Sequence, residues 1–373
     1  MTSKMWIYDE ITSVNIEISS LCNAACPWCP RYEDMSTVVN KQLDPAYVPV
    51  STFKEWFPEE FVSRIKFWTF TGDYGDAGTN PELPEVLRYI LKHNPSTRIQ
   101  INTNGGMKAP RHWKEIGEIL SGTKGIVIFS IDGLEDTNHI YRRNVKWEKV
   151  MANAEAYIAT GAEAWWDFLQ FKHNIHQVDE VQSLADSMGF TEVHFKYPHG
   201  FENGNMIVKD KNFIPLYEIE PINEDQISRV WIPLHGKKAE DLDYESIRED
   251  VENFFKDKEG EIKCFSQRNG DVEIRVSSWG AVYPCSMFGH LAKYPRENMQ
   301  FNKAQMIDIF KDKNISLKER TLKEILNADP YEFIYGSWKK KSCLACWGNC
   351  GVGPEKTPVM QQIYKKDKIY GTT

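Results

Sequence analysis

The chain has 373 residues, of which 41% are hydrophobic, so it is long enough to bury a full core in one large domain and a smaller second one. Its 53 acidic and 45 basic residues give a net charge of -8, which repels a phosphate backbone and an anionic membrane surface and argues against nucleic acid and membrane partners. The N-terminus shows no apolar run typical of a secretory signal and no stretch of about 18 apolar residues occurs, so we expect a cytoplasmic protein.

Short apolar, β-branched runs alternate with amphipathic segments over the first half of the chain. The predicted strands begin at Val14, Ile65, Arg98, Gly125, Trp165 and Glu192. The predicted helices, with apolar residues at i, i+3 and i+4, cover 52–63, 81–93, 111–120, 147–160 and 177–188. This alternation predicts an α/β fold with a parallel sheet and right-handed crossovers. Since a closed barrel needs eight such units, we expect a partial (β/α)6 TIM-like barrel or a doubly wound sheet.

Composition divides the rest of the chain into shorter segments. Residues 1–200 hold the βα alternation, and residues 201–262 are a polar, proline-bearing linker with one helix that begins near Asp243. Residues 263–353 open with an alternating segment around Trp279-Gly280 that is typical of a β-hairpin leading into cysteines. We therefore predict a small C-terminal β-hairpin/α domain, followed by a polar tail over residues 354–373.

Three of the eight cysteines lie directly after the first predicted strand, at Cys22, Cys26 and Cys29. In a reducing cytosol thiols stay free, so a cysteine cluster indicates metal or redox chemistry rather than disulfides. A structural zinc site is the alternative, but it usually has four protein ligands, and no fourth Cys or His lies nearby. Three thiolates on a four-iron cluster leave one iron open to coordinate a substrate, so the spacing favours an iron-sulfur cluster.

The segment CNAACPWC resembles the C-x-x-x-C-x-Φ-C loop of the radical SAM superfamily, with Trp28 at the aromatic position. In that superfamily the open iron chelates the amine and carboxylate of S-adenosylmethionine (SAM), and the aromatic residue lies near the adenine. The resemblance implies a SAM-binding [4Fe-4S] cluster that cleaves SAM reductively to a 5′-deoxyadenosyl radical. It also implies an external electron donor such as flavodoxin or ferredoxin.

The loops after the second and third predicted strands resemble further motifs of the superfamily. TGDYGD is similar to the G-G-E-P motif, with Gly75 retained and Asp76 in place of the glutamate. The resemblance makes Asp76, or the backbone here, the acceptor for the SAM ammonium, with Asp73 as a rival. Asn104 lies in a T-N-G motif after the third strand. Gly/Asp turns of this kind are common by themselves, so the order of the motifs carries the resemblance.

The fourth and fifth strands are followed by the remaining candidate SAM contacts. The S-I-D-G motif supplies Ser130 and Asp132, which the resemblance directs to the ribose or the carboxylate of SAM. One of the adjacent Arg142 and Arg143 resembles the arginine that pairs with the SAM carboxylate, and Arg143 is our candidate. A solvated arginine pair is the alternative. Asn174, after the fifth strand, resembles a polar SAM contact.

Five further cysteines lie in the C-terminal part of the chain, at Cys264, Cys285, Cys343, Cys346 and Cys350. Their spacing resembles the twitch domain, a shortened form of the SPASM extension of radical SAM enzymes, which implies one auxiliary [4Fe-4S] cluster. The first four cysteines fit that pattern best, and the fifth is left as an alternate ligand, a spare thiol or a reactive one. A zinc knuckle with four cysteine ligands is the alternative.

The resemblance implies an enzyme that abstracts hydrogen from a small metabolite, a sugar or a peptide. The auxiliary cluster would then transfer an electron or bind the substrate. The residues do not choose between dehydrogenation, rearrangement and crosslinking. The alternative is a non-catalytic iron-sulfur binding or scaffold protein, which would not need an open iron.

Overall fold

The computed structural model describes residues 5–41, 43, 45–196, 198, 200–201, 204–222, 261–267, 270–286, 288–289, 314–338, 346 and 350–352. The chain divides into two compact units, one formed by Asn15–Arg229 and the other by Met1–Val14 with Val230–Thr373. The first fourteen residues thus group with the C-terminal part of the chain rather than with the βα units. The helix expected near Asp243, the thiol of Cys343 and the tail over 354–373 lie outside the described residues.

The sheet of the Asn15–Arg229 unit follows the order of the chain. Its strands are β1 (Ser13–Ile16), β2 (Phe67–Phe70), β3 (Arg98–Thr103), β4 (Lys124–Ser130), β5 (Glu163–Leu169) and β6 (Glu192–Lys196), and they are neighbours in that order. From β2 to β6 every neighbouring pair is parallel. A doubly wound sheet reverses its strand order at a switch point, whereas this order runs in one direction, as in a barrel.

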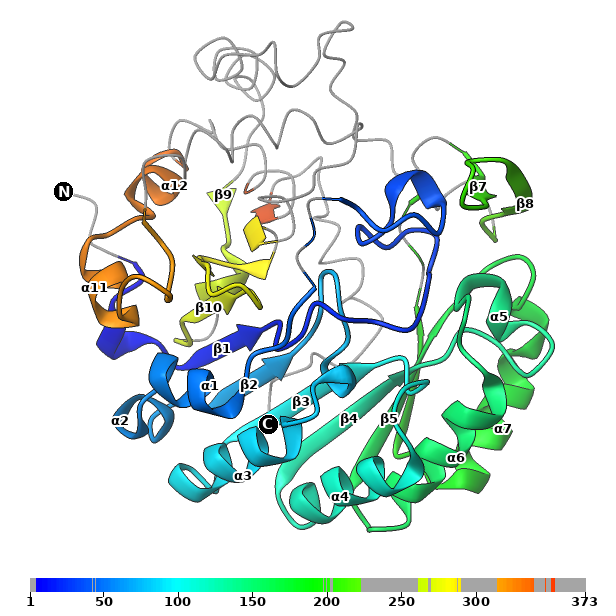
Figure 1. Ribbon diagram of the computed structural model, residues 1–373, viewed down its shortest axis with the longest axis horizontal. Coiled ribbons are helices and arrows are strands. Elements are labelled where there is room, and N and C mark those ends of the chain that lie inside the picture. Colours follow the sequence, from blue (N-terminus) through cyan, green and yellow to red (C-terminus); the bar gives the residue numbers. More distant parts are fainter. Residues whose placement is uncertain are drawn as a thin grey trace, which may run out of the picture. The chain divides into compact units, whose positions relative to one another are not determined.

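The helices of this unit are α1 (Val50–Trp56), α2 (Glu59–Val62), α3 (Leu83–His93), α4 (Pro110–Leu120), α5 (Asn138–Tyr141), α6 (Trp147–Ile158) and α7 (Val178–Met188), with 3-10 turns η2 (Glu33–Met35), η3 (Ala77–Thr79) and η4 (Ile175–Gln177). In Figure 1, α3, α4, α6 and α7 lie along one face of the sheet. The single helical layer and the sequential strand order confirm the partial (β/α)6 TIM-like barrel.

Aromatic side chains fill the space between the sheet and its helices. Phe129 of β4 lies 5.5 Å from Trp113 of α4 and 5.9 Å from Tyr157 of α6, measured between ring centroids. Because side chains alternate across a strand, the flanking residues of β4, Ile128 and Ser130, face the side away from these helices. The face of the sheet that packs on the helices therefore has an aromatic core, whereas the opposite face includes polar side chains such as Ser130.

A hairpin follows β6 where the sequence indicated only a linker. It consists of β7 (Met206–Lys209) and β8 (Pro215–Ile219), which pair antiparallel. The Tyr217 hydroxyl donates a hydrogen bond of 2.8 Å to the carbonyl oxygen of Ile140, which ties the hairpin to α5.

The other unit contains η1 (Tyr8–Glu10), β9 (Glu261–Ile262), η7 (Phe265–Gln267), β10 (Glu273–Val276), β11 (Val282–Tyr283), α11 (Leu322–Asn327), α12 (Glu332–Gly336) and β12 (Gly351–Val352). β10 and β11 pair antiparallel, which confirms the predicted hairpin around Trp279-Gly280. The Trp6 indole lies 5.4 Å from the Tyr331 ring, and its nitrogen donates to the carbonyl oxygen of Glu273 at 3.0 Å. These contacts explain why the N-terminal residues belong to this unit.

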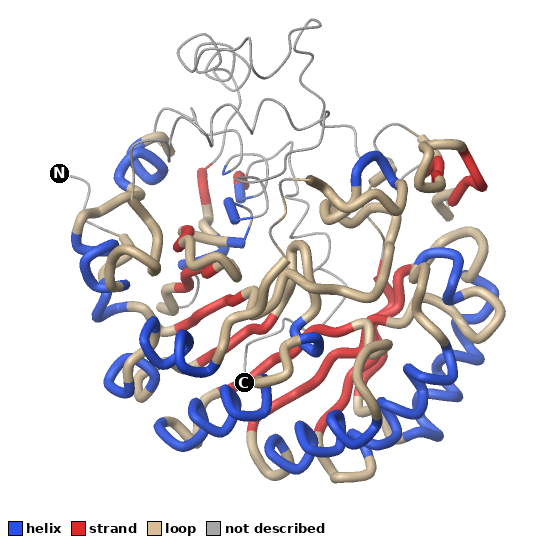
Figure 2. The backbone as a smooth tube through the Cα atoms, viewed as in Figure 1, coloured by secondary structure: helices blue, strands red, loops and turns tan. Residues whose placement is uncertain are grey.

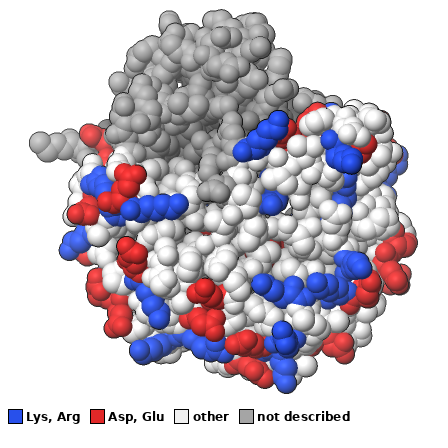
Figure 3. All heavy atoms as spheres, in the orientation of Figure 1, with Lys and Arg blue, Asp and Glu red and all other residues white. Residues whose placement is uncertain are grey.

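The described surface is mixed in charge. Figure 3 shows basic and acidic side chains interspersed over the described part of one face. Within the described ranges, no helix combines the length and the apolar character needed to cross a membrane.

Candidate active site

The loops that leave β1, β2 and β3 meet at one edge of the sheet (Figure 2). The Asp76 amide donates to the carbonyl oxygen of Leu21 at 2.8 Å, and the Asn104 amide donates to the Asp76 carboxylate at 2.7 Å. Because parallel strands end at the same edge of a sheet, motifs that follow successive strands in the sequence lie close together in the fold.

Cys22, Cys26 and Cys29 lie in a tight loop after β1. The Cys29 amide donates to the Cys26 carbonyl oxygen at 3.0 Å, and the Ala25 amide donates to the Arg143 carbonyl oxygen at 2.9 Å. The first bond closes a turn inside the loop, and the second ties the loop to the segment after β4.

The surroundings of these thiols are buried and negatively charged. Burial raises the pKa of the Cys22 thiol well above its usual value, and the charges of Asp76, Cys26 and Cys29 raise it further. Burial also raises the pKa of Cys26, although Arg142 opposes the rise. Because each thiolate acts on Cys22, the three thiols lie within one another's electrostatic reach. A bound metal centre reverses this preference, since a coordinating thiol is deprotonated.

The donor set fits an iron-sulfur centre. It consists of three thiols in one loop, and amide or guanidinium N–H groups lie near two of the sulfur atoms, which are contacts that tune such centres. In the part of the chain that the structure describes, no group of three or more His, Cys, Asp or Glu side chains is arranged to hold a single metal ion. The case for a cluster therefore rests on the chemistry of the donors.

Asp76 joins the loops after β2 and β3. One of its carboxylate oxygens accepts hydrogen bonds from the Gly78 amide and the Thr103 hydroxyl, both at 2.9 Å. The other oxygen accepts from the Asn104 amide at 2.7 Å and from its side-chain nitrogen at 2.9 Å. The Asn104 side-chain nitrogen also lies 3.6 Å from the Cys22 sulfur. The Asp76 carboxylate, which the sequence assigned to the SAM ammonium, thus already accepts four hydrogen bonds from protein donors. The same network places the Asn104 side chain beside the cysteine loop.

The backbone before Asp76 packs too closely for any side chain at Gly75. A Cβ atom there would lie 2.0 Å from the Ser19 carbonyl oxygen. The amides of Tyr74 and Gly75 donate to the buried carboxylate of Glu17, at 2.7 and 3.1 Å. Sequence reasoning missed Glu17, although a charged residue inside the apolar run VNIEIS was the available signal.

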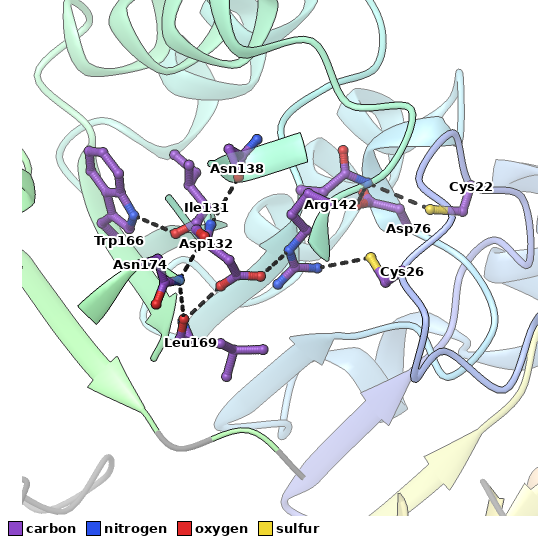
Figure 4. Close-up of polar contacts among 11 residues, drawn as sticks. Cys22, Cys26, Asp76, Ile131, Asp132, Asn138, Arg142, Trp166, Leu169 and Asn174 are labelled. Atoms are coloured by element: carbon purple, nitrogen blue, oxygen red, sulfur yellow. Dashed lines mark hydrogen bonds and ion pairs between the residues drawn. The ribbon is translucent and has the colours of Figure 1, made fainter. Parts of the chain in front are cut away.

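A buried ion pair connects the loop after β4 with the cysteine loop (Figure 4). A carboxylate oxygen of Asp132 lies 2.5 Å from Arg142 Nε, and the other accepts from the Leu169 amide at 2.7 Å. Arg142 Nη1 lies 3.6 Å from the Cys26 sulfur. Burial raises the pKa of Asp132 despite the opposing charge of Arg142. Burial also acts to lower the pKa of Arg142, but Asp132 and Cys26 outweigh it and hold that pKa above its ordinary value.

The two adjacent arginines therefore point to different places. The Arg143 guanidinium donates to the carbonyl oxygens of Lys209 at 3.2 Å and Met35 at 3.5 Å, in β7 and η2. Its neighbour Arg142 reaches the sulfur of the cysteine loop instead.

The Asn174 side chain connects the loops after β4 and β5 by hydrogen bonds. Its side-chain nitrogen donates to the carbonyl oxygens of Asp132 at 2.9 Å and Leu169 at 2.8 Å, and its side-chain oxygen accepts from the Phe171 amide at 2.6 Å. The side chain is fully buried, so the structure gives it a framework role that the sequence did not indicate.

The aromatic residue of the cysteine loop is covered by the segment after β6. A Cβ atom on Gly200 would lie 2.3 Å from the Trp28 ring, and Gly200 has a φ of +106°. Both the close approach and the positive φ require glycine. Backbone from the end of the sixth unit thus packs on the indole of Trp28.

Two residues that follow the third cysteine hold the loop in place, and sequence reasoning missed the first of them. The Arg31 guanidinium donates to the carbonyl oxygens of Ser20 and Tyr74. The Tyr32 hydroxyl donates to the Ala24 carbonyl oxygen at 2.8 Å.

A second cluster of polar side chains lies on β5 and β6. It is next to Ser130 of β4, because Ser130 pairs in register with Asp167 of β5. Asp167 binds the Lys196 ammonium at 2.7 Å and His194 Nδ1 at 2.9 Å, and His194 Nε2 lies 2.9 Å from Glu192. Burial acts to raise the pKa of Asp167, but His194 and Lys196 outweigh it and the pKa is lowered. Burial acts to lower the pKa of His194, but the two carboxylates outweigh it and the pKa is raised.

Four of the five C-terminal cysteines are described, namely Cys264, Cys285, Cys346 and Cys350. β12 pairs antiparallel with β9, and the Lys263 amide donates to the Cys350 carbonyl oxygen at 3.0 Å. This pairing brings Cys350 beside the backbone that leads into Cys264. Cys285 follows β11, and its charge is one of those that raise the pKa of the buried Tyr331, after burial itself.

Comparisons with known proteins identify the domain that carries the cysteine loop. No curated protein matches the sequence. Solved structures with a similar fold include SuiB from Streptococcus suis bound to the precursor peptide SuiA, at 14% identity over 82% of this chain and 65% of that chain, with a TM-score of 0.48. They also include anSMEcpe with bound AdoMet and Kp18Cys peptide (16% identity, 95% of both chains, TM-score 0.48) and BtrN in complex with AdoMet and 2-DOIA (13% identity, 89% of this chain and 91% of that chain, TM-score 0.40). The chain spans 66% of the length of SuiB with bound S-adenosylmethionine. The family description "Radical SAM superfamily" matches residues 16–175, which include the cysteine loop and the loops after β2 to β5.

Proposed function

We propose that the chain is a radical SAM enzyme that cleaves SAM to a 5′-deoxyadenosyl radical and abstracts hydrogen from a small metabolite, a sugar or a peptide. The observation that carries the proposal is the partly buried loop of Cys22, Cys26 and Cys29, with Arg142 and Asn104 beside two of its sulfur atoms. Three thiolates leave one iron of a [4Fe-4S] cluster without a protein ligand, and that iron is where SAM would bind. A cluster held there would supply the electron that breaks the S–C5′ bond.

The residues around the loop would bind and orient SAM. Arg142 is our choice for the SAM carboxylate in place of Arg143, because its planar guanidinium lies at the cysteine loop and suits a carboxylate. With Asp76 occupied by four donors, we assign the SAM ammonium to backbone carbonyl oxygens of the 72–76 loop and give Asp76 a positioning role. Trp28 and Ser130 remain our candidates for contacts with the adenine and the ribose.

We further propose one auxiliary [4Fe-4S] cluster in the C-terminal unit. The pairing of β9 with β12 supports Cys350 as a ligand together with Cys264, which leaves Cys343 or Cys346 as the spare thiol. An external flavodoxin or ferredoxin would supply the electrons.

The test is SAM cleavage by anaerobically reconstituted protein under a strong reductant. We expect about eight iron and eight sulfide per chain, as two four-iron clusters require, and release of 5′-deoxyadenosine and methionine. Replacement of Cys22, Cys26 and Cys29 by alanine should leave about four iron and abolish cleavage. Cleavage that survives this triple replacement would show that SAM binds elsewhere.

The same assay separates the enzyme from a scaffold. A protein that holds both clusters but releases no 5′-deoxyadenosine would be a binding or scaffold protein. Neighbouring genes decide between substrates, since a small precursor peptide encoded next to this chain would favour a peptide.

A further inference from the structure

Two cysteines of the loop have different neighbours. The Cys22 sulfur lies 3.6 Å from the side-chain amide of Asn104, which is neutral. The Cys26 sulfur lies 3.6 Å from the guanidinium of Arg142, which carries a full charge. Hydrogen bonds and charges at cysteine sulfur atoms are among the features that set the reduction potential of an iron-sulfur cluster.

The charge of Arg142 does not stand alone. Asp132 pairs with it at 2.5 Å, and the Asp132 side chain is completely buried while 17% of the Arg142 side chain is exposed. Asp132 is held in place from three directions: its carboxylate accepts from the Leu169 amide, its own amide donates to the Asn138 side-chain oxygen, and its carbonyl oxygen accepts from Asn174. The carboxylate is therefore fixed beside the guanidinium.

The sign of each charge has a direct consequence for a cluster on this loop. Reduction adds one negative charge to the cluster, so a nearby cation favours the reduced state and a nearby anion disfavours it. These effects are larger at a buried site than in water, because the effective dielectric constant is lower. A lone arginine at Cys26 would make the cluster easier to reduce and hence a weaker reductant towards SAM.

We propose that Asp132 and Arg142 set the reduction potential of the cluster on the cysteine loop, with Arg142 raising it and Asp132 lowering it. This inference rests on the cluster in the proposed function. It explains why Arg142, which we assign to the SAM carboxylate, forms an ion pair with the buried Asp132. The charge of Asp132 offsets that of Arg142 and keeps the reduction potential of the cluster low.

The test compares Arg142→Gln with Asp132→Asn in reconstituted protein without substrate. The measurement is a redox titration followed by electron paramagnetic resonance, using the signal that is lost when Cys22, Cys26 and Cys29 are replaced by alanine, because that signal belongs to the cluster on the cysteine loop. We expect Asp132→Asn to raise the midpoint potential and Arg142→Gln to lower it. Each change should alter the ratio of reduced to oxidised cluster at a fixed potential at least tenfold, which is about 59 mV for one electron.

Opposite shifts distinguish a charge effect from a disturbed loop, which would move both variants in the same direction. Arg143→Gln is the matched control, because the Arg143 side chain donates to backbone carbonyl oxygens in β7 and η2, and its potential should equal that of the wild type. Shifts of the same sign, or no shift in either variant, overturn the proposal.

If Asp132→Asn fails to fold, Arg142→Lys replaces it in the comparison. Lysine keeps the charge, so its potential should stay near the wild-type value while that of Arg142→Gln falls, and equal potentials for both overturn the proposal. Failure of the proposed function has a different signature, because wild-type protein would then show no cluster signal that responds to SAM.

Discussion

Gly75, in the loop after β2, lies against the backbone of Ser19 and Ser20, which leads into the cysteine loop. A Cβ atom there would lie 2.0 Å from the Ser19 carbonyl oxygen and 2.5 Å from the Ser20 Cα, so backbone must move to admit it. We expect Gly75→Ala to lower the free energy of unfolding by about 1–3 kcal/mol, as overpacking does, and to reduce the iron retained by the cysteine loop. Urea unfolding and iron analysis measure the two effects.

Gly336→Ala is the matched control for this substitution. It lies in α12, and a Cβ atom there meets nothing within 4 Å. We expect this variant to keep its iron and to gain up to about 1 kcal/mol of stability, because alanine is a better helix former than glycine. Equal stability of the Gly75→Ala and Gly336→Ala variants would contradict the close packing at Gly75.

Asp76 offers a second test at the same scale. Asp76→Asn replaces one acceptor oxygen by a nitrogen that donates, and either oxygen of Asp76 receives two donors. The new amide nitrogen would then face N–H or O–H donors in a buried site. We therefore expect the free energy of unfolding to fall by about 1–3 kcal/mol. The same exchange at the exposed Asp9 should cost less than about 0.5 kcal/mol. A loss at Asp76 as small as that at Asp9 would show that its hydrogen bonds are dispensable.

At the scale of secondary-structure elements, the sequence predicted six strands, β1 to β6, because each is a short apolar run followed by turn residues, whereas their order in the sheet comes from the structure. It predicted one helix over 52–63, where the structure has α1 and α2. Pro58 accounts for the break, since it lacks an amide hydrogen and cannot continue the helix that ends at Trp56. The hairpin β7–β8 was not predicted, because the apolar residues Ile207 and Leu216 occupy exposed positions and hide the alternation of apolar and polar residues expected of a half-buried strand.

The site was only partly readable from the sequence, for a related reason. Motif order located the loops, but it could not show where each polar side chain points. Asp76 and Asn174 turned out to bind protein donors and acceptors, while Arg142 rather than Arg143 turned to the cysteine loop. Such choices depend on pairing between strands that are distant in sequence.

The charged group on β5 and β6 should make stability depend on pH in a defined window. The folded-state pKa of Asp167 lies below its ordinary 3.8, so its stabilisation is complete above pH 3.8 and is lost as the pH falls through the folded value. The folded-state pKa of His194 lies above its ordinary 6.5, so its stabilisation is complete below pH 6.5 and is lost as the pH rises through the folded value. Asp167 and His194 therefore both contribute their full stabilisation between pH 3.8 and pH 6.5.

His194→Gln tests this window. The difference in unfolding free energy between wild type and variant should be largest between pH 3.8 and pH 6.5 and should shrink as the pH rises above 6.5 through the folded-state pKa of His194. Chemical unfolding of both proteins at a series of pH values measures it. A difference that is constant across this range would mean that His194 does not gain a proton in this group.

At the scale of the whole molecule, substitution of the C-terminal cysteines tests which thiols would bind the proposed auxiliary cluster. We expect Cys350→Ala to lose about four of eight iron, because β12 brings this residue beside the segment that contains Cys264. The matched variants Cys343→Ala and Cys346→Ala should differ, with one of them retaining all iron. Cys350→Ala that keeps its iron but loses turnover would instead indicate a thiol that donates a hydrogen atom to a substrate radical.

The covering of Trp28 by Gly200 has a consequence for how the protein is made. On the ribosome, the cysteine loop emerges about 170 residues before the glycine that packs on its tryptophan. At roughly 5–20 residues per second, the nascent loop stays without this packing on the order of ten to thirty seconds. During that interval its thiols would be more accessible than in the folded chain, so the rate of translation would affect how the proposed cluster is loaded.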